Sequence, residues 1–277
     1  WRRSVVAQHP RRDPRRDAHG SDVVSLKVGF VGTGHIAAPM ARVVARACHS
    51  VLVSERNAET AAALAAAFEN IAIAPNQAVL DGSDVVFLCV RPPLAEEVFA
   101  PLRFRPDHRV ISVMAGVPMT TLRRLSAPAT EIAVTIPLGF VEQGGCPLPV
   151  HPASKDLRVL FEPANPVIDV ATEAALNSHF AICALVPGVL SLLETGADWL
   201  GAATGDRAAA ELYTAQLMRG FLAASEPRSG GLAAERAALA TEGTLSLQMV
   251  EALRERGAQE VLRAALDAIG DRLDAAS

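Results

Sequence analysis

The stretch KVGFVGTGHIAAPM, residues 27–40, decides the fold of this chain. An apolar run ends at Gly32, a second glycine follows at Gly34, and an alanine-rich segment begins at about Ala37. This spacing predicts a buried strand that turns sharply into a helix, because Gly32 permits the tight turn and Ala37 lets the helix pack closely on the strand. Gly34 lacks the Cβ that would keep a phosphate from the backbone, and the amides at a helix start favour an anion. The stretch therefore predicts a dinucleotide site.

The rest of the chain shows two different patterns of apolar residues. From Leu26 to about Pro152, short β-branched runs alternate with alanine-rich segments, a pattern typical of a parallel sheet covered by helices. The runs VVFLCV and VISV are apolar throughout, as expected for central strands that are covered on both faces. After Pro152 the strands stop and apolar residues recur at helical spacing. We predict an α/β Rossmann-type parallel-sheet domain over residues 26–152 and an all-helical domain over residues 153–277.

Composition limits the possible partners of the protein. The 277 residues carry a formal net charge of -4, with 26 basic and 30 acidic residues, so no overall field attracts nucleic acid or an anionic membrane. Charges or prolines interrupt the apolar runs, so we expect no membrane-spanning helix. The four cysteines lack the paired spacing of a metal site. Residues 1–25 are rich in Arg, Pro and Asp and are expected to form a disordered tail. We expect a cytoplasmic protein with a small-molecule partner.

The helical half contains a segment that is almost entirely apolar. Residues 186–193 are apolar on nearly all sides of the expected helix, which predicts complete burial. We expect this helix to be shared between subunits, so that the helical domain forms a homodimer or a higher homo-oligomer.

The residues after the second expected strand, Ser54-Glu55-Arg56-Asn57, bear on the choice of coenzyme. Glu55 could accept a hydrogen bond from the ribose 2'-hydroxyl of NADH, whereas Arg56, flanked by Ser54 and Asn57, could hold the 2'-phosphate of NADPH. The sequence allows both. We favour NADPH, because an arginine among small hydrogen-bond donors suits a phosphate. The alternative for Arg56 is a solvated charge at a helix start.

The order GFVGTGHIA, SERN, DVVFLCVRPP and VISVMAGVP, followed by a helical half, resembles the pyrroline-5-carboxylate reductases over nearly the whole chain after Leu26. The resemblance implies an oxidoreductase that reduces the proline-biosynthetic imine by hydride transfer from NADPH or NADH. It also implies that two loops after central strands, Val90-Arg91-Pro92 and Met114-Ala115-Gly116, lie beside the ribose and the nicotinamide. The expected coenzyme-binding residues are then Gly32, Thr33, Gly34, His35, Ile36, Ser54, Arg56, Asn57, Val90, Arg91, Pro92, Ala115 and Gly116.

The substrate loops depart from the family pattern. Where the family has MPNTP this chain has IPLGF at residues 136–140, and where it has SGSGPA this chain has CALVPG at residues 183–188. The family's SPGGTT loop corresponds to TEGTLS at residues 241–246, which implies Thr241, Thr244 and Ser246 as the catalytic group. Ser246 would donate to the imine nitrogen, and Thr244 would help to orient the substrate. Glu242 places a negative charge beside the expected carboxylate site. The resemblance therefore indicates a divergent member that reduces pyrroline-5-carboxylate or a related imine.

Other functions remain open on the sequence. A β-hydroxyacid dehydrogenase would need a catalytic lysine on a helix of the second domain, and Lys155 precedes any such helix. A deazaflavin-dependent reductase resembles the first domain alone. A non-catalytic NAD(P)H-binding or regulatory protein fits the altered loops, and the Ser246 hydroxyl could instead bond its own backbone.

Overall fold

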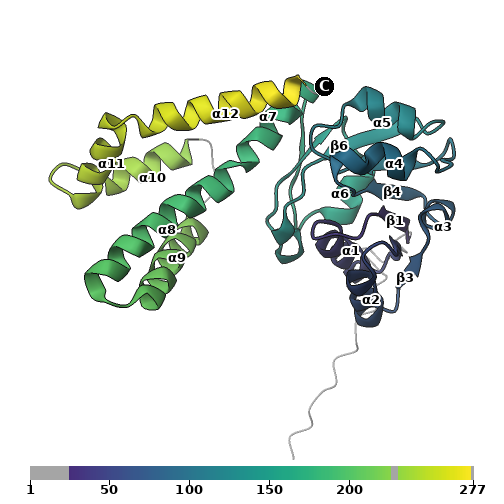
Figure 1. Ribbon diagram of the computed structural model, residues 1–277, viewed down its shortest axis with the longest axis horizontal. Helices are drawn as coiled ribbons and strands as arrows, with labels where there is room; N and C mark the ends of the chain where they lie inside the picture. Colours follow the sequence, from purple (N-terminus) through teal and green to yellow (C-terminus); the bar gives the residue numbers. More distant parts are fainter. Residues whose placement is uncertain (1–24, 226–229, 276–277) are drawn as a thin grey trace, which may run out of the picture. The chain divides into compact units, whose positions relative to one another are not determined.

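The computed structural model describes residues 25–225 and 230–275, and the chain forms two compact units (Figure 1). The first unit runs to Asn177 and the second from Ser178 to Ala275. Residues 153–177 thus belong with the sheet rather than with the helical half, because they contribute helix α6 (Lys155–Phe161) and strand β8 (Val167–Asp169) to it. The expected N-terminal tail lies, apart from Ser25, outside the described residues.

The first unit is built on one eight-stranded sheet, in the order β3-β2-β1-β4-β5-β6-β7-β8. The strands are β1 (Lys27–Val31), β2 (Ser50–Ser54), β3 (Ile71–Ala74), β4 (Val85–Leu88), β5 (Arg109–Ser112), β6 (Glu131–Thr135), β7 (Leu148–His151) and β8. Neighbouring strands are parallel except β6 and β7. The predicted Rossmann-type architecture is confirmed. The expectation that strands end at Pro152 was wrong, because β8 is an edge strand of only three residues and gives no periodic signal.

The core explains why the central strands are apolar throughout. Phe30 of β1 stacks on Phe87 of β4 with ring centroids 4.8 Å apart, and Phe161 of α6 meets Phe87 edge-on at 6.1 Å. This face of the sheet also buries α1 (Ala37–Arg46). The remaining helices of the unit are α2 (Ala58–Ala67), α3 (Asn76–Asp81), α4 (Ala95–Phe99) and α5 (Met119–Leu125), with short 3₁₀ helices η1 (Pro92–Leu94) and η2 (Gly139–Gln143).

The order of the strands creates a switch point at the carboxyl end of the sheet. From β1 the chain passes to β2 and β3 on one side, and it then crosses to β4 on the other side of β1. Open α/β sheets hold ligands in the crevice at such a point, because the loops leaving the two strands diverge there. The carboxyl ends of β1 and β4 therefore mark where a ligand is expected.

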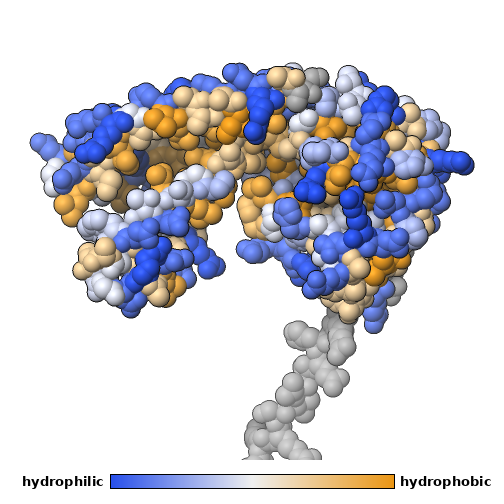
Figure 2. Space-filling view, in the orientation of Figure 1, coloured by the Kyte–Doolittle hydropathy of each residue, from blue (hydrophilic) through white to orange (hydrophobic). Residues whose placement is uncertain are grey.

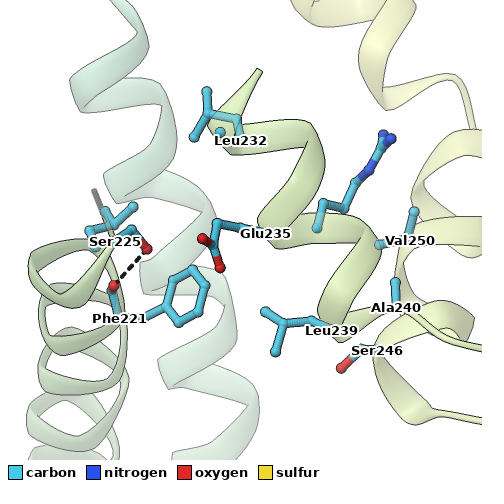
Figure 3. A pocket seen from close by; sticks show the side chains of 11 residues that line it. Phe221, Ser225, Leu232, Glu235, Leu239, Ala240, Ser246 and Val250 are labelled. Atoms are coloured by element: carbon cyan, nitrogen blue, oxygen red, sulfur yellow. Dashed lines mark hydrogen bonds between the residues drawn. The ribbon is translucent and has the colours of Figure 1, made fainter. Parts of the chain in front are cut away.

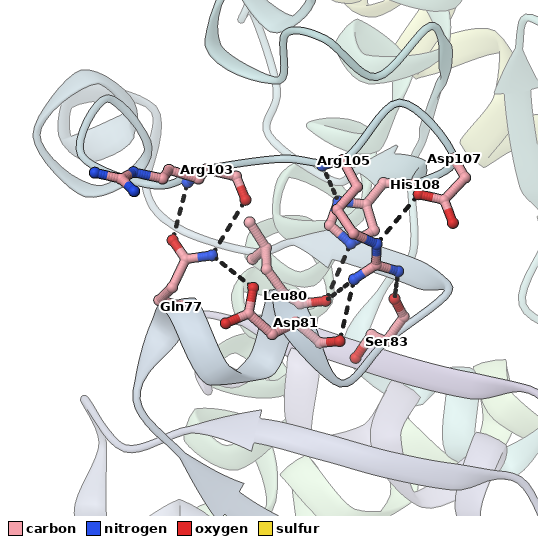
Figure 4. A network of polar contacts seen from close by, with 8 residues as sticks. All are labelled: Gln77, Leu80, Asp81, Ser83, Arg103, Arg105, Asp107 and His108. Carbon is pink, nitrogen blue, oxygen red and sulfur yellow. Dashed lines mark hydrogen bonds and ion pairs between the residues drawn. The ribbon is translucent and has the colours of Figure 1, made fainter.

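A polar network fixes the opposite end of the sheet (Figure 4). The Arg105 guanidinium donates to the carbonyl oxygens of Leu80, Asp81 and Ser83, which end helix α3. The His108 ring accepts from the Arg105 amide through Nδ1 at 2.9 Å, so its Nε2 carries the proton and donates to the Leu80 carbonyl at 3.0 Å. Burial and the Arg105 charge lower the pKa of His108. The network joins the turn before β5 to α3.

The second unit consists of helices alone, as predicted for the second half. They are α7 (Glu173–Cys183), which begins in the first unit, α8 (Leu185–Thr204), α9 (Arg207–Ala224), α10 (Gly231–Leu239), α11 (Leu245–Glu255) and α12 (Ala258–Asp274). Pro187 lies in the first turn of α8, where the missing amide removes no helical bond that the turn needs. Helices α8 and α9 form a hairpin in which Gly201 packs against Arg207.

The helical unit buries almost none of its large apolar side chains. Among its described residues the buried apolar side chains are three alanines, Ala181, Ala197 and Ala210, and Figure 2 shows apolar groups at the surface. Val186 is 52% exposed and Leu190 is 59% exposed. The predicted complete burial of residues 186–193 is therefore wrong for the single chain, because α9, which packs along α8, leaves Val186, Leu190 and Leu192 exposed. Exposed apolar surface of this kind is typical of interaction sites.

One helical stretch is longer and less interrupted by charges than expected from the sequence. By length and composition alone, Glu173–Thr204 is long and apolar enough to cross a bilayer, with a mean hydropathy of 1.7 and 11% of its most apolar window buried. No Asp, Glu, Lys or Arg stands between Glu173 and Glu194, and Pro187 does not end the helix.

Candidate coenzyme and substrate sites

A cavity of about 530 Å³ opens at the switch point of the sheet. It lies among the loops that leave β1, β2, β4 and β5 at their carboxyl ends. Its lining residues are Gly32, Thr33, Gly34, His35, Ile36, Arg56, Asn57, Cys89, Val90, Arg91, Pro92, Leu94, Val113, Met114 and Ala115. Four segments that are distant in sequence thus converge on one site.

The turn after β1 offers unpaired backbone donors to this cavity. The amides of Gly34, His35 and Ile36 donate to no acceptor within the described part of the chain, and α1 begins directly after them. A Cβ built on Gly34 would meet nothing within 4 Å, so the protein leaves open space beside that residue. Gly32 is different: its φ of +99° suits glycine, and a Cβ there would come within 2.6 Å of the Cys89 carbonyl oxygen. The turn needs Gly32 for its shape and leaves Gly34 open to a ligand.

The side chains of the cavity favour an anion. Arg56 and Arg91 line it, and neither has an ion-pair partner among residues 25–225 and 230–275. No carboxylate stands in the lining, and Glu55 is absent from it. Asn57 caps α2 through its side-chain oxygen at 3.4 Å from the Thr60 amide, which leaves its NH₂ group for a ligand. A dinucleotide with several phosphate charges fits this set of donors.

Most of the predicted coenzyme-binding residues line the cavity, but two do not. Ser54 is fully buried, and its hydroxyl is engaged with the turn after β1 instead of facing the cavity. Gly116 shapes its loop with a φ of +69° without entering the lining. Cys89, Leu94 and Val113 also line the cavity and were not predicted. The sequence signal for each of them is its place within two positions of a residue that was predicted.

The expected catalytic residues lie in the helical unit. Ser246 lines an apolar cavity of about 620 Å³ between α9, α10 and α11 (Figure 3). Around it stand Phe221, Leu239 and Val250, with the Glu235 carboxylate also in the lining. No hydrogen bond of the Ser246 hydroxyl occurs within the described residues. The serine hydroxyl is therefore available to a ligand.

The two threonines of the same loop have other surroundings. Thr244 is the N-cap of α11: its hydroxyl accepts from the Leu247 amide at 3.1 Å and donates to the Thr241 carbonyl at 2.7 Å. Its hydrogen is thus occupied, so Thr244 orients the start of α11 rather than a ligand. Thr241 does not line the cavity. The structure brings only Ser246 of the predicted catalytic group to a cavity.

A known protein-family model matches part of the first unit. Residues 27–116 match the family model described as NADP oxidoreductase coenzyme F420-dependent. That region contains β1 to β5 and all four loops that line the first cavity. A search of curated protein sequences found no match.

Solved structures match the chain far more widely. A 1-pyrroline-5-carboxylate reductase from Streptococcus pyogenes shares 20% identity and a TM-score of 0.74, over 91% of this chain and 99% of its own. The fold is that of the pyrroline-5-carboxylate reductases. A pyrroline carboxylate reductase from Plasmodium falciparum with NADP bound gives a TM-score of 0.73 at 14% identity, over 91% and 98% of the two chains. An imine reductase from Pseudomonas sp. gives 0.58 at 16% identity, over 91% of each chain. The reductase fold predicted from the sequence motifs is confirmed.

Proposed function

We propose that this protein is an oxidoreductase that uses NADPH to reduce a small cyclic imine. The observation that carries the proposal is the cavity at the switch point, with its three unpaired amides beside the open space at Gly34 and no carboxylate in its lining. The family model over residues 27–116 and the fold shared with NADP-bound and imine-reducing proteins support it.

NADPH is the proposed coenzyme because of what lines the cavity near the end of β2. Arg56 and the Asn57 amide lie in the lining, whereas Glu55, the residue that would accept from the 2'-hydroxyl of NADH, does not. A guanidinium is the preferred partner of a phosphate, and an acid is the usual partner of the ribose 2'-hydroxyl. The bound coenzyme would supply the hydride.

The protein's own part is to position and polarise the substrate. Ser246 would donate a hydrogen bond to the lone pair of the imine nitrogen, which draws electron density away from the C=N carbon that accepts the hydride. Thr244, as the N-cap of α11, holds the first turn on which Ser246 stands. Water or the substrate iminium would supply the proton.

Pyrroline-5-carboxylate is the leading substrate, and a related cyclic imine is the alternative. The family's polar substrate residues are replaced by apolar ones at 138–140 and 183–186, and Glu242 adds a negative charge to the loop. These changes favour an imine with more apolar surface. If pyrroline-5-carboxylate is reduced, the product is proline, and the enzyme serves proline biosynthesis in the cytoplasm.

We also propose that a second copy of the chain covers the helical unit. Exposed apolar side chains are spread over every helix from α7 to α12, among them Leu232 at 85% and Trp199 at 73%. A surface spread over six helices, with the Arg207–Asp198 ion pair at 2.5 Å between α8 and α9, suits a helical partner better than lipid. A homodimer would supply the core that three buried alanines cannot.

The second candidate is a coenzyme-binding protein without catalysis, favoured by the altered substrate loops. Oxidation of NADPH, followed by its absorbance with a panel of cyclic imines and keto acids, separates the two. Turnover of any imine supports the reductase, whereas coenzyme binding with no turnover supports the binding protein. In the reductase, Ser246→Ala should lower kcat by about 10²–10³-fold, while Ser50→Ala, at an exposed serine that begins β2 and lines neither cavity, should leave it unchanged.

A further inference from the structure

The last residue of β2 is tied to the turn after β1 by buried hydrogen bonds. The Ser54 hydroxyl accepts from the Gly32 amide at 2.8 Å. The Thr33 hydroxyl donates to the Ser54 carbonyl at 2.6 Å and also lies 3.2 Å from the Ser54 hydroxyl. Ser54 is 0% exposed and Thr33 is 2% exposed. These contacts join residues more than twenty positions apart in the sequence.

The hydrogens of this cluster can be assigned by counting. Thr33 has one hydroxyl hydrogen, which goes to the Ser54 carbonyl. The contact between the two hydroxyls is therefore made by the Ser54 hydrogen, while the Ser54 oxygen receives the Gly32 amide. Ser54 thus has no hydrogen left for a ligand, and it is closed off from solvent.

The same turn is held from its other side by β4. The Cys89 amide donates to the Val31 carbonyl at 2.8 Å, and the Gly32 backbone lies so close to the Cys89 carbonyl that a Cβ would come within 2.6 Å of it. The turn is therefore wedged between the ends of β4 and β2. Without the Ser54 hydroxyl, the β2 side would have no acceptor for the Gly32 amide.

We propose that Ser54 is a positioning residue for the dinucleotide turn and that it does not contact the 2'-phosphate. It takes up the Gly32 amide and fixes the turn, so that three later amides of the same turn, those of Gly34, His35 and Ile36, stay free for the pyrophosphate. From the sequence, Ser54 was expected among the residues that hold the 2'-phosphate. We assign it instead to the glycine turn. The inference rests on the proposed coenzyme function.

The test compares two coenzymes that share a pyrophosphate and differ in the 2'-phosphate. The full-length wild type, Ser54→Ala and Arg56→Ala are titrated with NADPH and with NADH by calorimetry. Ser54→Ala should weaken both coenzymes by the same factor, about tenfold, because it leaves a buried amide unpaired. Arg56→Ala should weaken NADPH and leave NADH within about twofold. A Ser54→Ala variant that weakens NADPH alone, or neither coenzyme, would overturn the inference.

Two controls keep the result interpretable. Circular dichroism and thermal melting without ligand show whether Ser54→Ala still folds. If it does not, Thr33→Val keeps the outline of the side chain and removes only its hydroxyl; it should weaken both coenzymes equally, at least about twofold, and unequal or unchanged affinities would contradict the inference. The wild-type titration separates the two claims, since a wild type that binds neither coenzyme refutes the proposed function itself.

Discussion

Glu142 and Arg42 are a hundred positions apart in the sequence, and their side chains form an ion pair at 3.0 Å. Arg46 reaches the other oxygen of the same carboxylate at 2.5 Å. Both arginines stand on α1, and Glu142 stands on η2, so the pair of contacts joins the helix behind the glycine turn to the segment after β6.

The first prediction concerns the stability that this ion pair contributes. Glu142→Gln should lower the free energy of unfolding by about 0.5–1 kcal/mol, because the groups are 25–52% exposed and solvent screens them. Burial alone would raise the pKa of Glu142, but hydrogen bonds from Arg46 and Arg42 outweigh it and the pKa is lowered. The contribution is therefore present above the ordinary pKa of 4.5 and is lost as the pH falls through the lowered value. Urea unfolding at pH 7 and at pH 4 measures it; an equal loss at both would contradict the assignment.

The second prediction concerns two buried histidines. Burial lowers the pKa of His49, and burial together with the Arg105 charge lowers that of His108. The folded protein therefore binds fewer protons than the unfolded chain below the ordinary pKa of 6.5. Stability should be complete above pH 6.5 and should fall as the pH drops through that value toward the lowered pKa values. Thermal melting from pH 7.5 to 5.5 follows it, and a wild type whose melting temperature is flat over that range would exclude it.

A third prediction tests the covering of the helical unit. Leu190→Glu places a charge on an exposed apolar position of α8, so it should turn a dimer into a monomer at micromolar concentrations. Gln259→Glu adds the same charge at an exposed polar position of α12 and should leave the dimer intact. Sedimentation equilibrium measures both. A wild type that is monomeric at these concentrations would refute the second copy as the covering.

The sequence alone predicts those strands and helices of the sheet unit that have strong local signals. The glycine spacing around Gly32 and the fully apolar strands predict β1, β4 and α1, because these features depend on neighbours in the chain. Strands β3, β7 and β8 were missed, since they have only three or four residues each and their pairing depends on distant partners. The apolar stretch at Val186 is buried as predicted only if another subunit covers it. The sequence of one chain does not say whether such a subunit binds there.

The candidate site also has features that could be predicted from the sequence and features that could not. Residue type and order placed Arg56, Asn57 and Arg91 at the cavity, because parallel strands bring their carboxyl ends to one edge. The direction of a side chain at a strand end was not predictable. Ser54 points inward to Gly32, and Thr244 is used as a helix cap, and both facts depend on hydrogen-bond geometry that sequence does not carry.

A comparison of two glycine substitutions separates the fold from the site. Gly32→Ala should destabilise the protein by roughly 1–3 kcal/mol or more, because it forces an alanine to a φ of +99° and against the Cys89 carbonyl. Gly34→Ala should change the stability by less than about 0.5 kcal/mol, because its Cβ meets nothing within 4 Å. Thermal melting distinguishes them, and a Gly34→Ala variant that melts as early as Gly32→Ala would show that the space at Gly34 is not open.

Calorimetric titration of NADPH into the wild type and into Gly34→Ala measures whether the open space beside Gly34 receives the pyrophosphate of the coenzyme. We expect that the wild type binds NADPH and that Gly34→Ala, with unchanged melting behaviour, binds it at least about tenfold more weakly, because the added methyl group occupies the space proposed for the pyrophosphate. A wild type without affinity for NADPH or NADH, or a folded Gly34→Ala variant with wild-type affinity, would contradict it.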